Sequence, residues 1–110
     1  MDIDMYAQQQ TVAVLDETDL YISSLPEVTE WCYSASGKDA IAVGLITKPM
    51  FTLSAINAFR ESVKKALTDM GYARVEVTTD ADLYYAISKQ GKQGTAEQVA
   101  RLCDMAQKRR

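Results

Sequence analysis

The chain has 110 residues, which is enough for one domain but not for two independent hydrophobic cores. It contains no histidine, and this excludes Ser-His-Asp and Cys-His catalytic groups as well as histidine-containing metal sites. The net charge of -3, from 12 basic and 15 acidic residues, argues against nucleic-acid binding. No apolar run approaches the ~18 residues that a membrane-spanning helix needs.

The domain is predicted to begin with a β-hairpin. Residues 1–10 lack apolar periodicity, so we expect a lead-in or linker there, followed by a single domain over residues 11–110. Alternating apolar side chains predict strands at residues 11–15 and 20–23, and the polar residues 16–19 between them predict a turn.

The next segment, residues 25–39, has no clear pattern. Pro26 and Gly37 interrupt it, so it is either a long loop or a loop that contains a helical turn around residues 27–31. Residues 40–46 then alternate and are apolar on both faces. This predicts a central strand that is at least partly covered on both sides.

The clearest element is a helix over residues 54–70. Thr52 or Ser54 can cap its N-terminus, and Gly71 stands where a left-handed C-cap glycine belongs. One face carries apolar side chains at the i, i+3, i+4, i+7 spacing of an amphipathic helix. These are Ile56, Phe59, Val63, Ala66, Leu67 and Met70.

The C-terminal third is predicted to contain a strand and two helices. Residues 73–79 alternate, with Val75 and Val77 facing inward and the polar side chains facing outward. Those polar residues are Arg74, Glu76 and Thr78. Asp80 is expected to cap the next helix, and Thr95 to cap the last one in a capping box with the residue three positions on.

This order of elements, β-β-β-α-β-α-α, predicts an α+β fold. Short connections favour a small mixed or antiparallel sheet of about four strands. Two to three helices are expected to pack on one face of that sheet.

Asp80 and Asp82 are the one acidic pair near an element boundary. They form either a metal or acid–base pair, or a helix cap followed by an acid in the first helical turn. We favour capping, because a spacing of two at a helix start does not point both carboxylates at one substrate. The sequence therefore predicts no catalytic residue, no metal ligand and no cofactor.

One loop and the two cysteines resemble functional sites, but each has a structural explanation. Residues 91–95 have the composition of a phosphate-binding loop but the wrong residue order, so we expect a helix–helix connection. Cys32 and Cys103 cannot form a four-ligand zinc site without histidine. A disulfide between them needs an oxidising compartment and suitable geometry, which the sequence does not test.

Four aromatic residues can either pack in the core or form a partner-binding patch, namely Trp31, Tyr33, Tyr84 and Tyr85. Tyr84 and Tyr85 are adjacent in a predicted helix, so their side chains diverge by about 100° and at least one is expected to face outward. Trp31, Tyr33 and Tyr85 are the candidate interaction surface.

The chain resembles the YhcN/YlaJ-type sporulation lipoproteins over residues 11–90. The most specific match is the passage from strand to helix at residues 75–84, with the pattern V-x-V-(S/T)-x-D-x-D followed by an aromatic or aliphatic residue. The other matching segments are residues 12–14, residues 20–22, residues 41–43 and the helix from Ser54. The chain departs from the family in having no lipoprotein signal, and Cys32 lies too far from the start to carry a lipid.

The resemblance implies a non-enzymatic role in sporulation or germination, in the cell envelope or associated with the spore. The partner would be another protein or a second copy of the chain, and any membrane contact would need an anchor that this chain lacks. The alternative is a cytoplasmic, ferredoxin-like module that senses a ligand or regulates, because no signal peptide is visible. An enzyme that uses Asp80, Asp82 and Cys32 is the least supported hypothesis.

Overall fold

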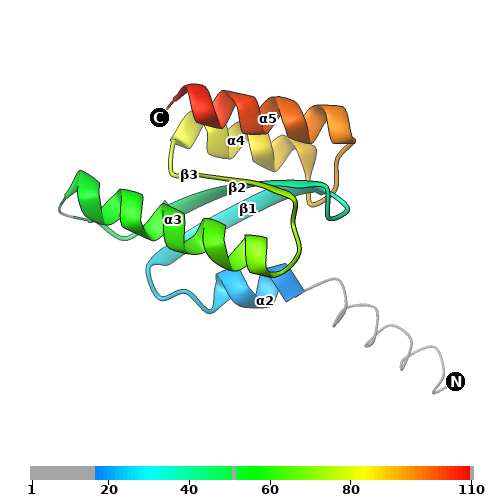
Figure 1. Cartoon of the computed structure of the whole chain (residues 1–110). Coiled ribbons are helices and arrows are strands. Elements are labelled where there is room, and N and C mark those ends of the chain that lie inside the picture. Colours follow the sequence, from blue (N-terminus) through cyan, green and yellow to red (C-terminus); the bar gives the residue numbers. More distant parts are fainter. Residues whose placement is uncertain (1–16, 51, 110) are drawn as a thin grey trace, which may run out of the picture.

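The computed structural model describes residues 17–50 and 52–109. Within them lie three strands and four helices, so the predicted α+β class is confirmed, but the sheet has three strands, not about four. In chain order (Figure 1) the elements are α2 (Glu17–Ser23), β1 (Val28–Ser36), β2 (Ala40–Thr47), α3 (Leu53–Asp69), β3 (Arg74–Thr78), α4 (Ala81–Gln90) and α5 (Ala96–Lys108).

The sheet is mixed, with the strand order β1-β2-β3. β1 and β2 form an antiparallel hairpin, and β3 pairs in parallel with β2 after the crossover helix α3. The prediction that residues 40–46 form a central strand is therefore confirmed.

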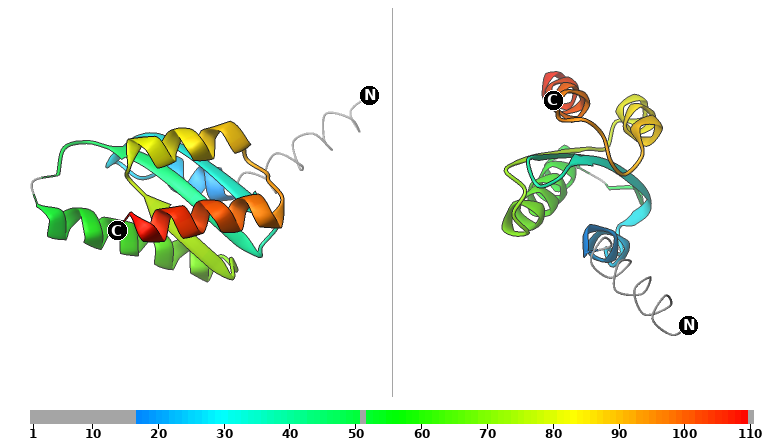
Figure 2. Two further views of the ribbon diagram at one scale, coloured as in Figure 1. Left: turned by 90° about the horizontal axis from the view of Figure 1, so that it is seen from above. Right: turned by 90° about the vertical axis from the view of Figure 1, so that its right-hand side faces the viewer.

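Helices cover both faces of the sheet, so the prediction of one covered face is wrong. α4 and α5 lie over one face, and α2 and α3 lie over the other (Figure 2). The reason lies in β2, which is apolar in both directions and would otherwise expose one face to water. Its large side chains, Ile41, Val43 and Leu45, point toward α2 and α3, and its small residues, Ala40, Ala42 and Gly44, point toward α4 and α5.

The predicted strand at residues 20–23 is wrong, because these residues belong to helix α2. Thr18 and Ile22, four residues apart on one helical face, are 3% and 0% exposed, whereas Leu20 is 64% exposed. The hairpin turn predicted at residues 16–19 is wrong for the same reason, because residues 17–19 also lie in α2. The predicted lead-in at residues 1–10 and the strand at 11–15 lie outside the described residues.

Residues 25–39, expected to be a loop or a loop with a helical turn, contain the nine-residue strand β1. Its register against β2 shifts between Val28 and Glu30, which marks a bulge. Beyond Val28 the strand contains no Val, Ile or Leu, so it lacks the aliphatic alternation by which a strand is recognised in a sequence. Gly37 has a φ of +53° and begins the turn into β2.

The helix predicted over residues 54–70 is confirmed as α3. Its buried face is formed by Phe59, Val63 and Leu67. Thr52, not Ser54, is the N-cap, because its hydroxyl accepts a hydrogen bond from a backbone N–H three residues on. Gly71 follows the helix with a φ of +106°, as the prediction of a left-handed glycine requires.

In β3, Val75 and Val77 lie in the core shared with α3, as predicted. Glu76 and Thr78 do not face solvent as the alternation predicts, since they are only 3% and 4% exposed. Their face of the sheet is covered by α5. Glu76 Oε1 lies 3.9 Å from Lys64 Nζ of α3.

The predicted caps of the last two helices are confirmed. Asp80 caps α4, and Thr95 caps α5 in a reciprocal capping box with Gln98. Gly91, with a φ of +72°, ends α4. The buried face of α5 consists of Val99, Leu102, Cys103 and Ala106.

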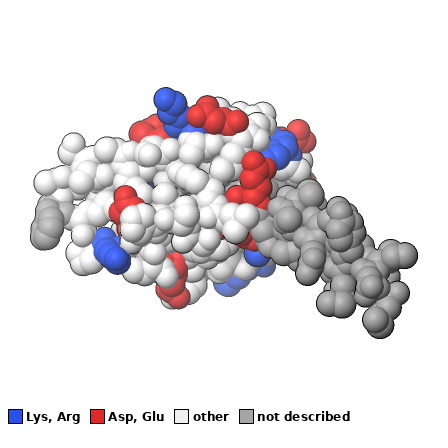
Figure 3. All heavy atoms as spheres, turned by 90° about the horizontal axis from the view of Figure 1, so that it is seen from below, with Lys and Arg blue, Asp and Glu red and all other residues white. Residues whose placement is uncertain are grey.

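The described surface carries mixed charges. On the α2/α3 face, positive and negative side chains are scattered and form no continuous patch of one sign (Figure 3). Four large apolar side chains are exposed, namely Leu20, Leu53, Tyr85 and Met105. Among residues 17–50 and 52–109, no helix has the length and apolar character to cross a membrane.

Candidate interaction site at the edge of the sheet

Trp31 and Tyr33 form a stacked pair on β1, an edge strand. They lie two residues apart, so both side chains project from the same face of the strand. Their ring centroids are 6.0 Å apart and their planes differ by 6°. Tyr33 is 7% exposed and belongs to the core, whereas Trp31 is half-buried and packs at the margin of that core.

A hollow of about 380 Å³ lies beside this pair. β1 contributes one wall, and the end of α4 with the loop after it contributes the other. The lining residues are Trp31, Cys32, Tyr33, Ser88, Gly91 and Lys92. A hollow with an aromatic wall and a few polar groups has the composition of a binding site for a side chain or a small molecule.

The side chain of Lys92 reaches from the loop after α4, past the edge strand β1, to helix α2. Its Nζ donates a hydrogen bond of 2.8 Å to Asp19 Oδ2 on α2. The same Nζ lies 6.0 Å from the centroid of the Trp31 ring, at the outer limit of a cation–π contact. The side chain of Asp19 is only 13% exposed, so this ion pair is screened less than a surface pair.

The loop that carries Lys92 is held against β1. The backbone N–H of Gly94 donates to the carbonyl of Ala35 at 3.1 Å, and Gln93 forms a parallel bridge with the same residue. A Cβ on Gly94 would lie 2.8 Å from Ser34 Oγ, so any larger residue here would force the Ser34 hydroxyl to move. The position of Lys92 is therefore set by its neighbours and not by its own salt bridge alone.

Tyr85 does not join the other two candidate residues. It lies on the outer side of α4, is 62% exposed, and meets Tyr84 edge-to-face with 5.7 Å between ring centroids. Of the three residues in the candidate interaction surface, the structure thus brings Trp31 and Tyr33 together and leaves Tyr85 apart.

Sequence reasoning did not identify Asp19, Ser88 or Lys92 as parts of this site. Residues 91–95 do connect two helices, as predicted, but no local pattern indicates that Lys92 pairs with a residue 73 positions away. Because residues 16–19 were predicted to form a hairpin turn, Asp19 was not expected on a helix. The one available signal is Gly94, because an interior loop glycine indicates a close backbone approach.

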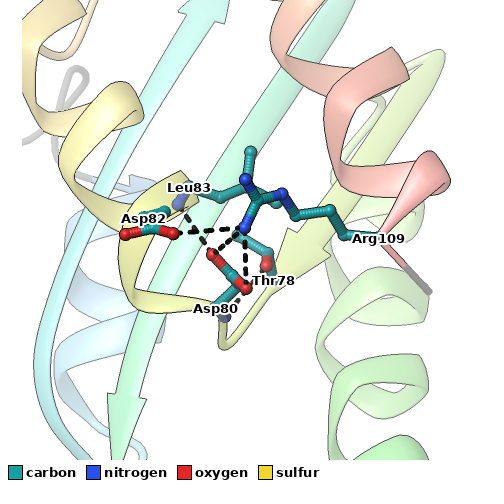
Figure 4. A network of polar contacts seen from close by, with 5 residues as sticks. All are labelled: Thr78, Asp80, Asp82, Leu83 and Arg109. Carbon is teal, nitrogen blue, oxygen red and sulfur yellow. Dashed lines mark hydrogen bonds and ion pairs between the residues drawn. The ribbon is translucent and has the colours of Figure 1, made fainter.

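Asp80 and Asp82 converge on one partner, Arg109 (Figure 4). Arg109 Nη1 lies 3.2 Å from both carboxylate oxygens of Asp80 and 3.3 Å from Asp82 Oδ2. The capping role of Asp80 is confirmed by its bond from the N–H of Leu83 at 3.0 Å. The two carboxylates meet at a side chain of the same chain because the end of α5 lies beside the start of α4.

This arrangement holds Asp80 in its ionised form. The pKa of Asp80 lies below its usual value, chiefly because the N–H of Leu83 donates to it and further because of Arg109. Arg109, at the end of α5, therefore ties this helix to the start of α4. We assign the cluster a structural role.

Both cysteines are free thiols. Cys32 Sγ lies 3.3 Å from the carbonyl of Tyr84, and Cys103 Sγ lies 3.8 Å from the carbonyl of Ile41. Burial raises the pKa of each thiol to about 11. A thiol that stays protonated at neutral pH is a poor nucleophile.

Within residues 17–50 and 52–109, no three side chains of the metal-binding types His, Cys, Asp or Glu come together. A second hollow, of about 470 Å³, lies between the start of α3 and the end of α5. Its two arginines already have partners in the fold, since Arg60 bonds to Asn57 and Arg109 to Asp80.

The chain matches no protein-family model, no curated protein and no solved structure.

Proposed function

We propose that this chain is a non-catalytic association module that binds a protein partner, or a second copy of itself, at the hollow beside β1. The observation that carries the proposal is the stacked pair Trp31 and Tyr33 at a sheet edge, next to an open hollow. Aromatic side chains that are partly buried at a surface supply much of the binding free energy of protein interfaces.

The titratable groups of the described chain favour this proposal over an enzyme. Asp80 and Asp82 share a guanidinium, and the raised pKa of about 11 keeps Cys32 protonated. General acid–base and nucleophilic catalysis instead need groups whose pKa lies near the working pH.

The biological setting follows from the resemblance to sporulation lipoproteins. We propose that the module acts in the cell envelope or the spore, during sporulation or germination. Antibody detection in fractionated spores tests this location: signal in the envelope or spore fractions is expected, and signal confined to the cytoplasm of growing cells would contradict it.

Site-specific photo-cross-linking tests the association. In the test variant, the photoreactive residue benzoylphenylalanine replaces Ser88, which lines the hollow. In the control variant, it replaces Ser62, an exposed residue on α3. We expect a defined cross-linked product in the native cell from position 88 and not from position 62. The product should disappear in the Trp31→Ala background, and a product that persists there would contradict the proposal.

The size of the hollow also favours a second candidate, a ligand-sensing module. A volume of about 380 Å³ lies in the range of small-molecule sites. A thermal-shift screen with metabolites separates the two: a ligand that raises the melting temperature of the wild type but not of Trp31→Ala would favour sensing.

A further inference from the structure

We propose that Lys64 and Glu76 close the outer edge of β3, the side that faces away from β2, so that a strand from a second copy of this chain cannot pair with it. This inference does not depend on the association proposed above. It concerns the opposite edge of the sheet and restricts where the chain can bind another copy of itself.

The backbone of β3 presents polar groups on this outer edge. In the order β1-β2-β3, β3 is the last strand of the described sheet. The N–H of Ala73 points toward β2, since it donates to the carbonyl of Lys38 in the turn before that strand. Because the direction of these groups alternates along a strand, those of Arg74, Glu76 and Thr78 face outward. Such a row of outward groups is a template for pairing with another strand.

The ion pair of Lys64 and Glu76 passes around this edge. Lys64 is on α3, whereas Glu76 points to the opposite face, because its neighbour in the sheet register, Ala42, packs under α4 and α5. Lys64 Nζ nevertheless lies 3.9 Å from Glu76 Oε1. Since β2 occupies the inner side of β3, the two side chains can meet only at the outer edge (Figure 2). Their contact therefore covers the backbone of the strand.

Burial makes this cover costly to remove. Glu76 as a whole is 3% exposed, so its outward backbone is shielded together with its carboxylate. A strand that paired with β3 would have to displace the Lys64 side chain and take this cation away from a buried carboxylate. A lysine on the edge and a charged residue that points inward are both features by which natural sheets avoid such pairing.

The two edges of the sheet are closed by different means. At β1, the loop after α4 forms a backbone bridge to Ala35. Among the described residues, no segment forms a bridge to the outer side of β3. Charged side chains lie there instead, and Arg74 and Asp104 add a second ion pair at the start of the strand. Side chains can be exchanged without rebuilding the fold, so the edge of β3 can be tested by substitution.

The test removes both charges from the full chain. Trp31→Ala is the parent, so that association at the hollow beside β1 does not contribute. Lys64→Ala/Glu76→Val is then added, which removes the side chain at the edge and the charge that points inward. We expect dimers or larger species whose fraction rises with concentration, and a mean mass above that of the parent at each concentration. Size-exclusion chromatography with light scattering measures this mass.

Lys64→Ala/Glu76→Pro is the matched control. It removes the same two charges, but proline has no N–H to donate, and a sheet accepts proline where the N–H would face outward. This variant should keep the mass of the parent. Glu61→Val/Lys65→Ala makes the same two exchanges on exposed residues of α3 and should also keep it. The second control separates strand pairing from a general gain in hydrophobicity.

Circular dichroism and the denaturation midpoint show whether each variant is folded. If a variant at position 76 does not fold, Lys64→Ala alone provides the test, because it leaves the strand unchanged and should still raise the mass, though less. A folded test variant with the mass of the parent would overturn the proposal, and so would an equal rise in either control. None of these results depends on cross-linking at position 88, so the proposed function is tested separately.

Discussion

The backbone of Tyr84 lies directly against Gly44: a Cβ on Gly44 would be 3.0 Å from the Cα of Tyr84. Gly44 is on the central strand and Tyr84 is on α4, so this contact sets how closely α4 approaches the sheet. The wall of the hollow that α4 supplies depends on this distance.

Gly44→Ala should therefore destabilise the fold by about 1–3 kcal/mol, the usual effect of overpacking. The added methyl group meets helix backbone, which cannot rotate away. Urea denaturation of the variant measures the loss. Adding Cys32→Ala removes the thiol 3.2 Å from the new Cβ but not the backbone contact, so it should restore little of the stability. A Gly44→Ala variant as stable as the wild type would contradict the close approach.

Leu67 and Leu53, both on α3, should respond very differently to truncation. Leu67 is 0% exposed, and Leu67→Ala should lower the free energy of unfolding by about 2–5 kcal/mol through the cavity it leaves. Leu53 is 70% exposed, and Leu53→Ala should change it by less than about 0.5 kcal/mol. Denaturation midpoints of the two variants check this prediction. Equal effects would show that the face of α3 that carries Leu67 is not the buried one.

Thr18 and Tyr72 share a buried hydrogen bond of 2.8 Å that fastens α2 to the domain. Tyr72→Phe leaves the Thr18 hydroxyl buried without this bond and should be destabilising by about 1–3 kcal/mol. The double variant Thr18→Val/Tyr72→Phe removes both polar groups and should recover part of that loss. Tyr85→Phe, on the exposed side of α4, is the neutral control, and thermal unfolding measures all three.

Arg109 and Asp80 give a pH-dependent contribution to stability. Because the pKa of folded Asp80 lies below its ordinary value of 3.8, the stabilisation is fully present above pH ~4 and is lost as the pH falls through the lowered pKa. Arg109→Met should raise the pKa of Asp80 without restoring its ordinary value, because the Leu83 N–H is the larger cause. Carbon NMR titration of the carboxyl group measures this.

The matched control for that titration is Arg101→Met. Arg101 pairs with Glu97, one turn away on the same helix, at 3.5 Å. This change should leave the pKa of Asp80 as it is. An Asp80 titration that Arg109→Met does not move would mean that the contact between the two helix ends is absent in solution.

The thiols should react slowly with iodoacetamide at neutral pH. With a pKa of about 11 for both cysteines, the thiolate fraction grows about tenfold per pH unit up to that value. In the Cys32→Ser variant the remaining thiol, Cys103, is 0% exposed and should be alkylated only after unfolding. Rapid alkylation of either residue at pH 7, followed by mass spectrometry, would contradict the burial described here.

Some elements could be read from the sequence because they depend on neighbours in the chain. The amphipathic helix α3, the strand β2 and the caps at Asp80 and Thr95 rest on contacts a few residues long. The strand β1 is not recognised because it has no Val, Ile or Leu beyond Val28. The helix α2 is not recognised because it spans only seven residues.

Tertiary structure alone decided which polar residues are buried and which distant residues meet. Glu76 alternates like a solvent-facing residue, yet α5 covers it because the central strand needs helices on both faces. Lys92 and Asp19 are 73 residues apart, and their pairing across β1 follows only from how the loop after α4 packs. Local periodicity determines an element, whereas the partner of a charged side chain depends on the packing of the whole fold.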